Sequence, residues 1–241
     1  MDALSYHVYW SPPLTESTAA SATPVVAQQV QRFQELMRQR GHAKPIYMSE
    51  GGIRCPPFAS WLPPDGFERS APFGSEKGAG VVLTAVDAAG GLVRGMVEML
   101  SAGVTNIFYY YSGDVQGAMP WFSTMANGYY VLLDYDARPK PTMMAYSALE
   151  SFLLDARPVE VMRRDGLTVH WFARGKGSVA IAWSASARPL PMPPGASVFD
   201  LMGNEMKRPE LNAGEPVYVV APNLTPAQTR NLLVEPRGHP G

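Results

Sequence analysis

The sequence predicts an α/β protein that continues into a small antiparallel β-domain. Three strand patterns alternate with three helical patterns over residues 1–156, and short strand patterns without helices fill residues 157–222. Strands that alternate with helices favour a parallel sheet with right-handed crossovers, whereas a run of short strands favours a separate antiparallel unit. We therefore expect an α/β region, then a small β-sandwich, and a loose tail over residues 223–241, which has few anchoring residues.

The first strand and helix of the α/β region have clear sequence boundaries. Residues 3–10 form an aromatic-rich strand pattern that starts without a lead-in segment. A helical pattern follows, with a Thr-Pro pair that suits its start and Gly41 at its C-terminal end. The next strand pattern, residues 45–49, is apolar and is followed at once by Glu50. A carboxylate at the end of a buried strand faces either solvent or a functional site.

The second and third strand-helix units follow in the same order. Residues 51–80 are rich in proline and aromatic residues, and a loop of this length is usually functional in a compact domain. Helical patterns cover residues 81–102 and 142–154, and Gly90-Gly91 weakens the middle of the first. The strand pattern between them, residues 104–111, ends in three tyrosines.

The β-domain consists of strand patterns separated by turn residues. Dipeptides such as Asp165-Gly166 are typical of tight hairpins. The predicted strands are residues 159–163, 167–174, 178–183, 196–201 and 217–220.

The composition excludes several classes of function. The chain has 241 residues, a net charge of -1 and no visible basic patch, so we expect neither nucleic acid nor a membrane surface as a partner. Cys55 is the only cysteine, which excludes an intramolecular disulfide and a Cys-rich metal site. No apolar run is long enough to span a membrane, and the N-terminus lacks the pattern of a signal peptide. The localisation stays open.

Four segments carry a resemblance to a known family. They are a first strand that ends His-x-Tyr, the run Ile-Tyr-Met-Ser-Glu-Gly at residues 46–51, the aromatic strand end at residues 107–111, and Arg-Pro-Lys-Pro at residues 138–141. In this order, residues 2–155 resemble the last three βα units of the (β/α)8 barrel of clan A retaining glycoside hydrolases. Families 39 and 5 are the most similar in pattern. The resemblance implies a partial TIM-type barrel, equivalent to strands 6–8, followed by the family's C-terminal β-sandwich.

The resemblance also assigns catalytic roles. Active sites of such barrels lie at the C-terminal ends of the strands, where His7, Tyr9 and Glu50 would meet. Glu50 would be the nucleophile that attacks the anomeric carbon of a glycoside. Tyr9 would donate its hydroxyl to Glu50, and His7 would contact the Glu50 network or the sugar, unless it is a buried core histidine. No metal and no organic cofactor are implied.

The expected sugar contacts come from the third strand and the loops. Tyr110 and Tyr111 stand where the resemblance places an aromatic floor under the sugar, although that residue is often tryptophan. Trp61 and Trp121 would be stacking platforms, or alternatively plugs for a small core. Asp114 would bind a sugar hydroxyl or cap its own loop.

One residue of the family's catalytic pair is absent. Retaining glycosidases need a second carboxyl group about 5–5.5 Å from the nucleophile, and in these barrels it follows the fourth strand, before this sequence begins. Glu16, Glu68 and Glu76 are loop carboxylates, but nothing in their surroundings selects one as the acid. We expect a fragment of a longer enzyme, a chain completed by a second polypeptide or by self-association, or a degenerate relative, and we expect the isolated chain to associate.

The sequence therefore predicts a retaining O-glycoside hydrolase module that acts on an oligosaccharide or glycoside. A non-catalytic carbohydrate-binding or scaffolding protein is the main alternative. An unrelated α/β enzyme that uses Glu50 as a general base is a weaker one, because the sequence has no phosphate-binding glycine loop, no metal-ligand spacing and no Gly-x-Ser-x-Gly motif. A full-length parent would be a candidate for secretion or for the periplasm.

Overall fold

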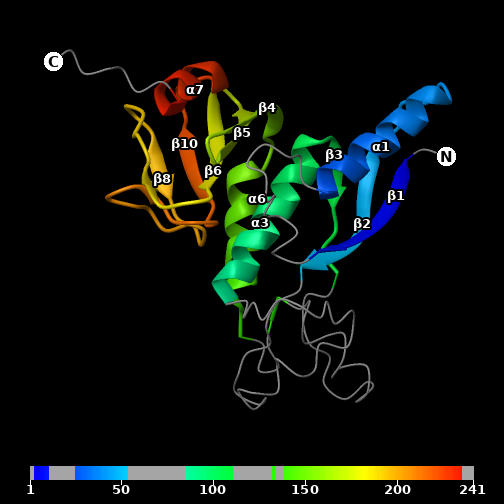
Figure 1. The fold of residues 1–241 in the computed structure, drawn as a ribbon, viewed down its shortest axis with the longest axis horizontal. Coiled ribbons are helices and arrows are strands. Elements are labelled where there is room, and N and C mark those ends of the chain that lie inside the picture. The colour runs from blue at the N-terminus through cyan, green and yellow to red at the C-terminus, as the bar shows by residue number, and fades with distance from the viewer. Residues whose placement is uncertain (1–2, 11–24, 54–84, 111–131, 134–137, 235–241) are drawn as a thin grey trace.

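A computed structural model describes residues 3–10, 25–53, 85–110, 132–133 and 138–234, and it confirms the mixed α/β class. A three-stranded sheet and a five-stranded sheet lie on either side of two long helices, α3 and α6 (Figure 1). The elements of the α/β region are β1 (Leu4–Trp10), α1 (Val25–Gln39), β2 (Ile46–Ile53), α3 (Ala85–Ser101), β3 (Val104–Ile107) and α6 (Pro141–Leu153).

The β-domain, residues 157–234, contains the remaining elements. Its strands are β4 (Arg157–Arg164), β5 (Leu167–Arg174), β6 (Gly177–Ser184), β7 (Arg188–Pro189), β8 (Ser197–Phe199), β9 (Glu210–Leu211) and β10 (Val217–Ala221), and α7 (Pro226–Val234) follows. The antiparallel pairs form a five-stranded sheet of order β4-β5-β6-β10-β8 and a two-stranded β7-β9 ribbon. None of the helices that the structure describes is long and apolar enough to cross a membrane.

The expected loose tail is wrong for residues 226–234. They form α7, which lies against β5 and β6. Thr229 is fully buried and its hydroxyl is 2.6 Å from that of Ser178, while Leu233 joins the apolar cluster on the same side of the sheet. One buried hydroxyl pair and one leucine therefore anchor a helix of low overall hydrophobicity.

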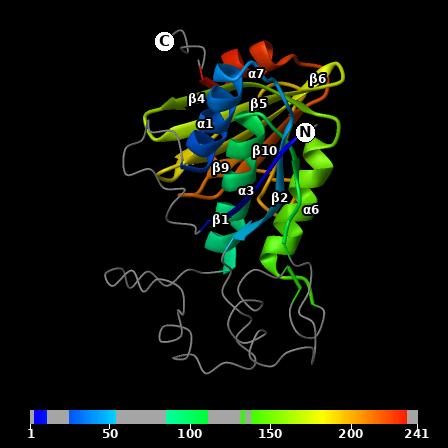
Figure 2. The same cartoon turned by 90° about the vertical axis from the view of Figure 1, so that its right-hand side faces the viewer.

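The three-stranded sheet is parallel, with order β1-β2-β3. Its inner face, which includes Tyr6, Val8, Ile46 and Met48, packs toward the helices. The pairing register places the other face on the opposite side, and we call it the outer face: Ser5, His7, Tyr47, Glu50 and Asn106. In Figure 2, β1 and β2 lie in front of α3.

Helix α1 covers one end of the inner face. Its buried residues Val26 and Val30 recur at helical spacing, and the Phe33 ring meets the Tyr6 ring edge-on at 5.3 Å. The last helical residue is Gln39, and Gly41, with a φ of 72°, closes the C-terminal end as predicted. The N–H groups of Gly41 and His42 donate to the Arg38 and Met37 carbonyls, which is the Schellman arrangement.

Helix α3 joins the two sheets and runs unbroken through Gly90-Gly91. Its apolar residues, such as Leu92 and Val97, are fully buried in a core that also contains Met48 of β2 and Tyr218 of β10. Instead of breaking the helix, Gly90 allows close packing, because an added Cβ would lie 3.2 Å from the Gly214 carbonyl oxygen. The α/β region and the β-domain therefore share one continuous hydrophobic core.

A buried polar network links α3 to the β-domain. Glu98 of α3 is 2% exposed, and its carboxylate accepts hydrogen bonds from Arg163 of β4 and, at 3.1 Å, from Nε2 of His170 of β5. The other imidazole nitrogen, Nδ1, lies 2.7 Å from the Ser101 hydroxyl, and the ring stacks on Trp183. Every polar atom of the imidazole thus has a partner, as buried polar groups require.

Burial and pairing act in opposite directions on the pKa values of this network. Burial lowers the pKa of His170, and this outweighs the hydrogen bond to Glu98, which raises it. Burial raises the pKa of the Glu98 carboxyl, but the hydrogen bonds and charges of His170 and Arg163 together hold it below its ordinary value. A neutral imidazole beside a charged carboxylate is the state that these shifts favour.

The free energy of unfolding is therefore expected to fall as the pH drops below about 6.5, the usual pKa of histidine. In that range the unfolded chain takes up a proton at His170 that the folded protein does not, which costs at most about 1.4 kcal/mol per pH unit. Urea unfolding at pH 7 and pH 5 measures this slope. A His170→Gln variant should show a shallower slope, whereas the exposed control His42→Gln should keep that of the natural chain.

Candidate active site

A β-bulge in β2 determines where Glu50 points. Tyr6 pairs with Met48 and His7 pairs with Glu50, so Ser49 is an extra residue in β2. The other neighbouring strand follows the same spacing, because the N–H groups of Phe108 and Tyr110 donate to the Met48 and Gly51 carbonyls, both at 2.8 Å. Bulges re-aim side chains and are frequent next to active sites.

The bulge moves Glu50 from the inner face to the outer face. In a regular strand, Ile46, Met48 and Glu50 would share one face, and the first two are fully buried against the helices. The observed register instead pairs Glu50 with His7 on the outer face. Glu50 lies inside β2, three residues before its end, and not directly after the strand as predicted.

Gly51 follows the bulge and lets β1 approach closely. A Cβ at this position would collide with the backbone carbonyl oxygen of Val8, and it would lie 2.9 Å from the Met48 sulfur. Backbone atoms of a paired strand cannot move aside easily, so only glycine fits. The glycine next to Glu50 is thus a requirement of packing between β1 and β2.

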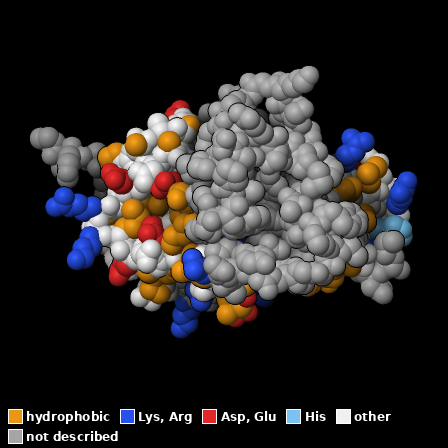
Figure 3. Space-filling model, turned by 90° about the horizontal axis from the view of Figure 1, so that it is seen from below, with side chains coloured by type: hydrophobic (Ala, Val, Ile, Leu, Met, Phe, Trp, Pro, Cys, Tyr) orange, Lys and Arg blue, Asp and Glu red, His pale blue; other side chains and the backbone are white. Residues whose placement is uncertain are grey.

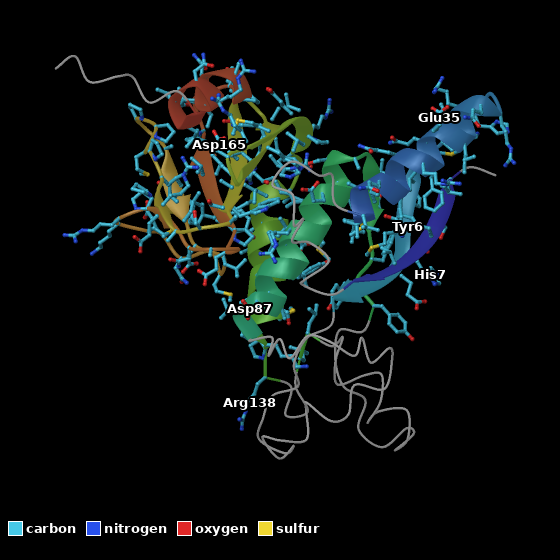
Figure 4. The ribbon with its side chains drawn as sticks, in the orientation of Figure 1. Tyr6, His7, Glu35, Asp87, Arg138 and Asp165 are labelled. Carbon is cyan, nitrogen blue, oxygen red and sulfur yellow. The ribbon has the colours of Figure 1, made fainter. Side chains whose placement is uncertain are left out.

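His7 and Glu50 form a pair on the outer face. His7 Nδ1 lies 3.5 Å from Glu50 Oε2, and the two side chains are 58% and 30% exposed. The exposure of His7 excludes the reading of a buried core histidine. Figure 4 shows that His7 and Tyr6 extend to opposite sides of β1. Tyr6 lies on the inner face, where burial raises its pKa to about 12.

The sequence gives no signal for two further residues near Glu50. Ser49 shares the outer face with Tyr47 through the ordinary alternation of strand side chains, and its hydroxyl is hydrogen-bonded to that of Ser5 on β1. The two residues are 44 positions apart, so their contact depends on the pairing of β1 with β2. Serines at exposed strand positions are too common to be selected from sequence alone.

The tyrosine run after β3 divides between the two faces. The Tyr109 ring packs against Tyr146 of α6, with ring centroids 6.1 Å apart, so Tyr109 belongs to the inner face. The N–H of Tyr110 continues the pairing with β2, and the alternation of strand side chains gives Tyr110 the same face as Glu50. Of the predicted aromatic floor, Tyr110 is therefore on the side of the candidate site.

Other predicted site residues are not placed. Tyr9 pairs with Gly52 in the backbone register, two pairs beyond His7–Glu50, and nothing further is described of it. Trp61, Tyr111, Asp114 and Trp121 lie outside the described residues, as do the loop carboxylates Glu16, Glu68 and Glu76. Within the described ranges, no three His, Cys, Asp or Glu side chains cluster as metal ligands do.

The arrangement suits a carboxylate that reacts with a ligand on the outer face. Glu50 is partly exposed, it is held on the central strand, and its neighbour His7 has a ring nitrogen close enough to orient or share a proton with it. A carboxylate placed in this way can act as a nucleophile or as a general base.

Solved structures with a similar fold are glycoside hydrolases. A family 39 glycoside hydrolase from the gut symbiont Bacteroides cellulosilyticus WH2 matches 91% of this chain with a TM-score of 0.60 and 16% identity. A family 86 enzyme solved in complex with neoagarooctaose matches 91% with a TM-score of 0.53 and 10% identity. A family 30 subfamily 8 xylanase from Clostridium acetobutylicum matches 77% with a TM-score of 0.49 and 10% identity.

The first two likenesses, with TM-scores above 0.5, show a fold related to that of glycoside hydrolases. The matches cover 44%, 38% and 44% of the three neighbours, so the chain spans less than half the length of each. No protein-family description matches the sequence, and no curated protein matches it.

Proposed function

We propose that this chain is the C-terminal portion of a retaining O-glycoside hydrolase in which Glu50 is the nucleophile. The observation that carries the proposal is the bulge at Ser49, which directs Glu50 away from the helix-covered face and pairs it with His7 near the C-terminal ends of parallel strands. The fold likeness to glycoside hydrolases supports the same reading. The strands would then belong to a partial (β/α)8 barrel, whose sites lie at this end.

In the proposed reaction, a Glu50 oxygen attacks the anomeric carbon of a bound sugar. The bond from that carbon to the leaving oxygen breaks, and the leaving group takes the electron pair, which gives a covalent glycosyl-enzyme ester. Water then hydrolyses the ester and restores Glu50. An acid that protonates natural leaving groups would come from outside this chain, so the chain alone would act only on activated glycosides.

His7 would act as a positioning residue for Glu50. A proton on Nδ1 would point toward Glu50 Oε2 across the 3.5 Å separation, which would help to orient the carboxylate. We propose that Tyr9 adds a second donor, as the family resemblance implies. Tyr110 would contact the sugar, and we propose the same role for Tyr111, Asp114, Trp61 and Trp121.

The barrel would be completed by further polypeptide. The sheet has only three strands among the described residues, and β1 and β3 are its two edges. Unpaired strand edges favour pairing with additional strands. We propose either self-association or a second polypeptide at these edges.

A Glu50→Gln variant tests the catalytic reading. Glutamine keeps the shape of the side chain but is a far weaker nucleophile, so release of dinitrophenol from activated dinitrophenyl glycosides should fall to the uncatalysed rate. The affinity of the variant for the same sugar without the dinitrophenyl group should change little. Glu150→Gln, an exposed glutamate on α6, is the matched control and should keep the full rate.

The second candidate is a non-catalytic carbohydrate-binding or scaffolding protein. The 58% exposure of the His7 side chain beside Glu50 favours it, because catalytic carboxylates usually work in enclosed sites. Sugar binding without any Glu50-dependent release of dinitrophenol would establish this candidate in place of the enzyme.

A further inference from the structure

Two adjoining cavities lie on the β-domain around the β7-β9 ribbon. Their volumes are about 420 Å³ and about 560 Å³, and both are lined by Arg188, Pro189 and Leu190. The first also reaches Asp165 at the β4-β5 turn, and the second reaches Lys207 and the segment before β9. The two cavities have Arg188, Pro189 and Leu190 in common, and together we call them the ribbon cleft. Figure 4 shows Asp165 and His7 at opposite ends of the molecule, so this cleft is separate from Glu50.

The rim of the ribbon cleft is positively charged. Four basic residues line it, namely Arg164, Arg188, Lys207 and Arg208, against two acidic residues, Asp165 and Glu210. This excess contrasts with the net charge of -1 of the whole chain. Figure 3, a view from below, shows Lys and Arg side chains that project from the end of the molecule occupied by the β-domain.

Three of these cations are available to a ligand. The exposed side chains of Arg188, Lys207 and Arg208 make no hydrogen bond or ion pair with any residue that the structure describes. Arg164 differs, because its Nε donates to the neighbouring Asp165 at 3.1 Å. An unpaired arginine offers a planar donor fork that matches a carboxylate or a sulfate.

The floor of the ribbon cleft is apolar and held in place. Leu190 and Leu211 are 7% and 0% exposed and belong to the apolar cluster on this side of the sheet. Arg188 pairs with Leu211 and Pro189 pairs with Glu210, while the Leu190 N–H donates to the Pro209 carbonyl at 3.3 Å. A pre-formed floor lowers the entropic cost of binding.

We propose that the ribbon cleft binds an acidic glycan, a chain of sugars that carries carboxylates or sulfate esters. Its two neighbouring cavities suit a ligand of several units, its cations suit repeated anionic groups, and its exposed prolines, Pro189 and Pro191, suit the C–H face of a sugar ring. That the ligand is a glycan rests on the proposed function. That it is anionic is inferred from the basic residues of the ribbon cleft. Nucleic acid fits less well, because bases stack on aromatic side chains and the described residues that line the cleft include none.

The test is calorimetric titration of the chain with a galacturonic acid hexamer and with a chondroitin sulfate hexasaccharide. Binding that weakens as salt rises is expected for at least one of them, and a neutral galactose hexamer should not bind at the cleft. An Arg188→Ser/Arg208→Glu double variant should weaken binding at least about tenfold, because it removes two charge-assisted contacts. The control Lys176→Glu changes another exposed cation, at the β5-β6 turn, and should leave binding unchanged.

Three outcomes would overturn the proposal: no binding of either acidic probe, equal loss in the Lys176→Glu control, or tighter binding of a single-stranded oligonucleotide at the same residues. Release of dinitrophenol, measured on the same variants, separates this inference from the proposed function. It should be unchanged, because the cleft and Glu50 lie in different parts of the molecule.

Discussion

Replacing Glu98 with alanine is expected to lower the free energy of unfolding by about 3–5 kcal/mol, the usual loss when one member of a buried charged pair is removed. The change would leave the Arg163 guanidinium, whose side chain is only 18% exposed, without its carboxylate. It would also remove the partner of His170 Nε2, whose ring is fully buried. Because total stability is typically 5–15 kcal/mol, such a loss would be a large part of it.

Urea unfolding followed by circular dichroism measures this loss. Glu150→Ala on α6 is the control, since Glu150 is exposed and its removal should cost less than about 1 kcal/mol. A Glu98→Gln variant gives a second test, because glutamine keeps the shape of the side chain and removes only its charge. If Glu98→Ala proves as stable as Glu150→Ala, the network does not hold α3 on the β-domain.

The change Gly51→Ala is expected to cost about 1–3 kcal/mol, the usual effect of forcing an extra carbon into a packed position. The new Cβ would collide with the Val8 carbonyl and crowd the Met48 side chain, so β1 and β2 would have to separate. Their separation would also disturb the register that brings His7 to Glu50. We therefore expect loss of stability together with loss of any reaction at Glu50.

A matched control separates crowding from backbone strain. Gly41→Ala places a side chain where φ is 72° but where no atom lies within 4 Å, so it should cost only the strain of about 1 kcal/mol and leave Glu50 reactive. Both variants are compared by urea unfolding and by the release of dinitrophenol. Equal behaviour of the two would contradict the close approach of β1 to Gly51.

Local patterns predicted the elements well, because each depends on neighbouring residues. The β5 strand has the predicted bounds 167–174, and the end of α1 at Gly41 follows from the left-handed conformation that glycine adopts easily. The tail was predicted to be loose because it has few anchoring residues, whereas one hydroxyl contact of Thr229 with the sheet helps to anchor α7.

The site was less predictable, because its geometry depends on contacts between distant residues. The sequence suggested His7 and Glu50, but the extra residue at Ser49 that brings them together is a property of the pairing with β1 and β3. The Glu98 network also depends on contacts between distant residues, since Glu98 and His170 are 72 positions apart. Nothing in the spacing of these residues along the chain indicates their contact.

The most direct test of the central claim is the mass of the intact protein after incubation with dinitrophenyl 2-deoxy-2-fluoro glycosides. Their leaving group departs without an acid, so the probe asks only whether a nucleophile meets a bound sugar. The account predicts an increase by one fluorosugar, located on Glu50 by peptide sequencing and absent from Glu50→Gln. Folded protein that gains no mass from any sugar in the panel, or gains it on another residue, would contradict the assignment of Glu50 as the nucleophile.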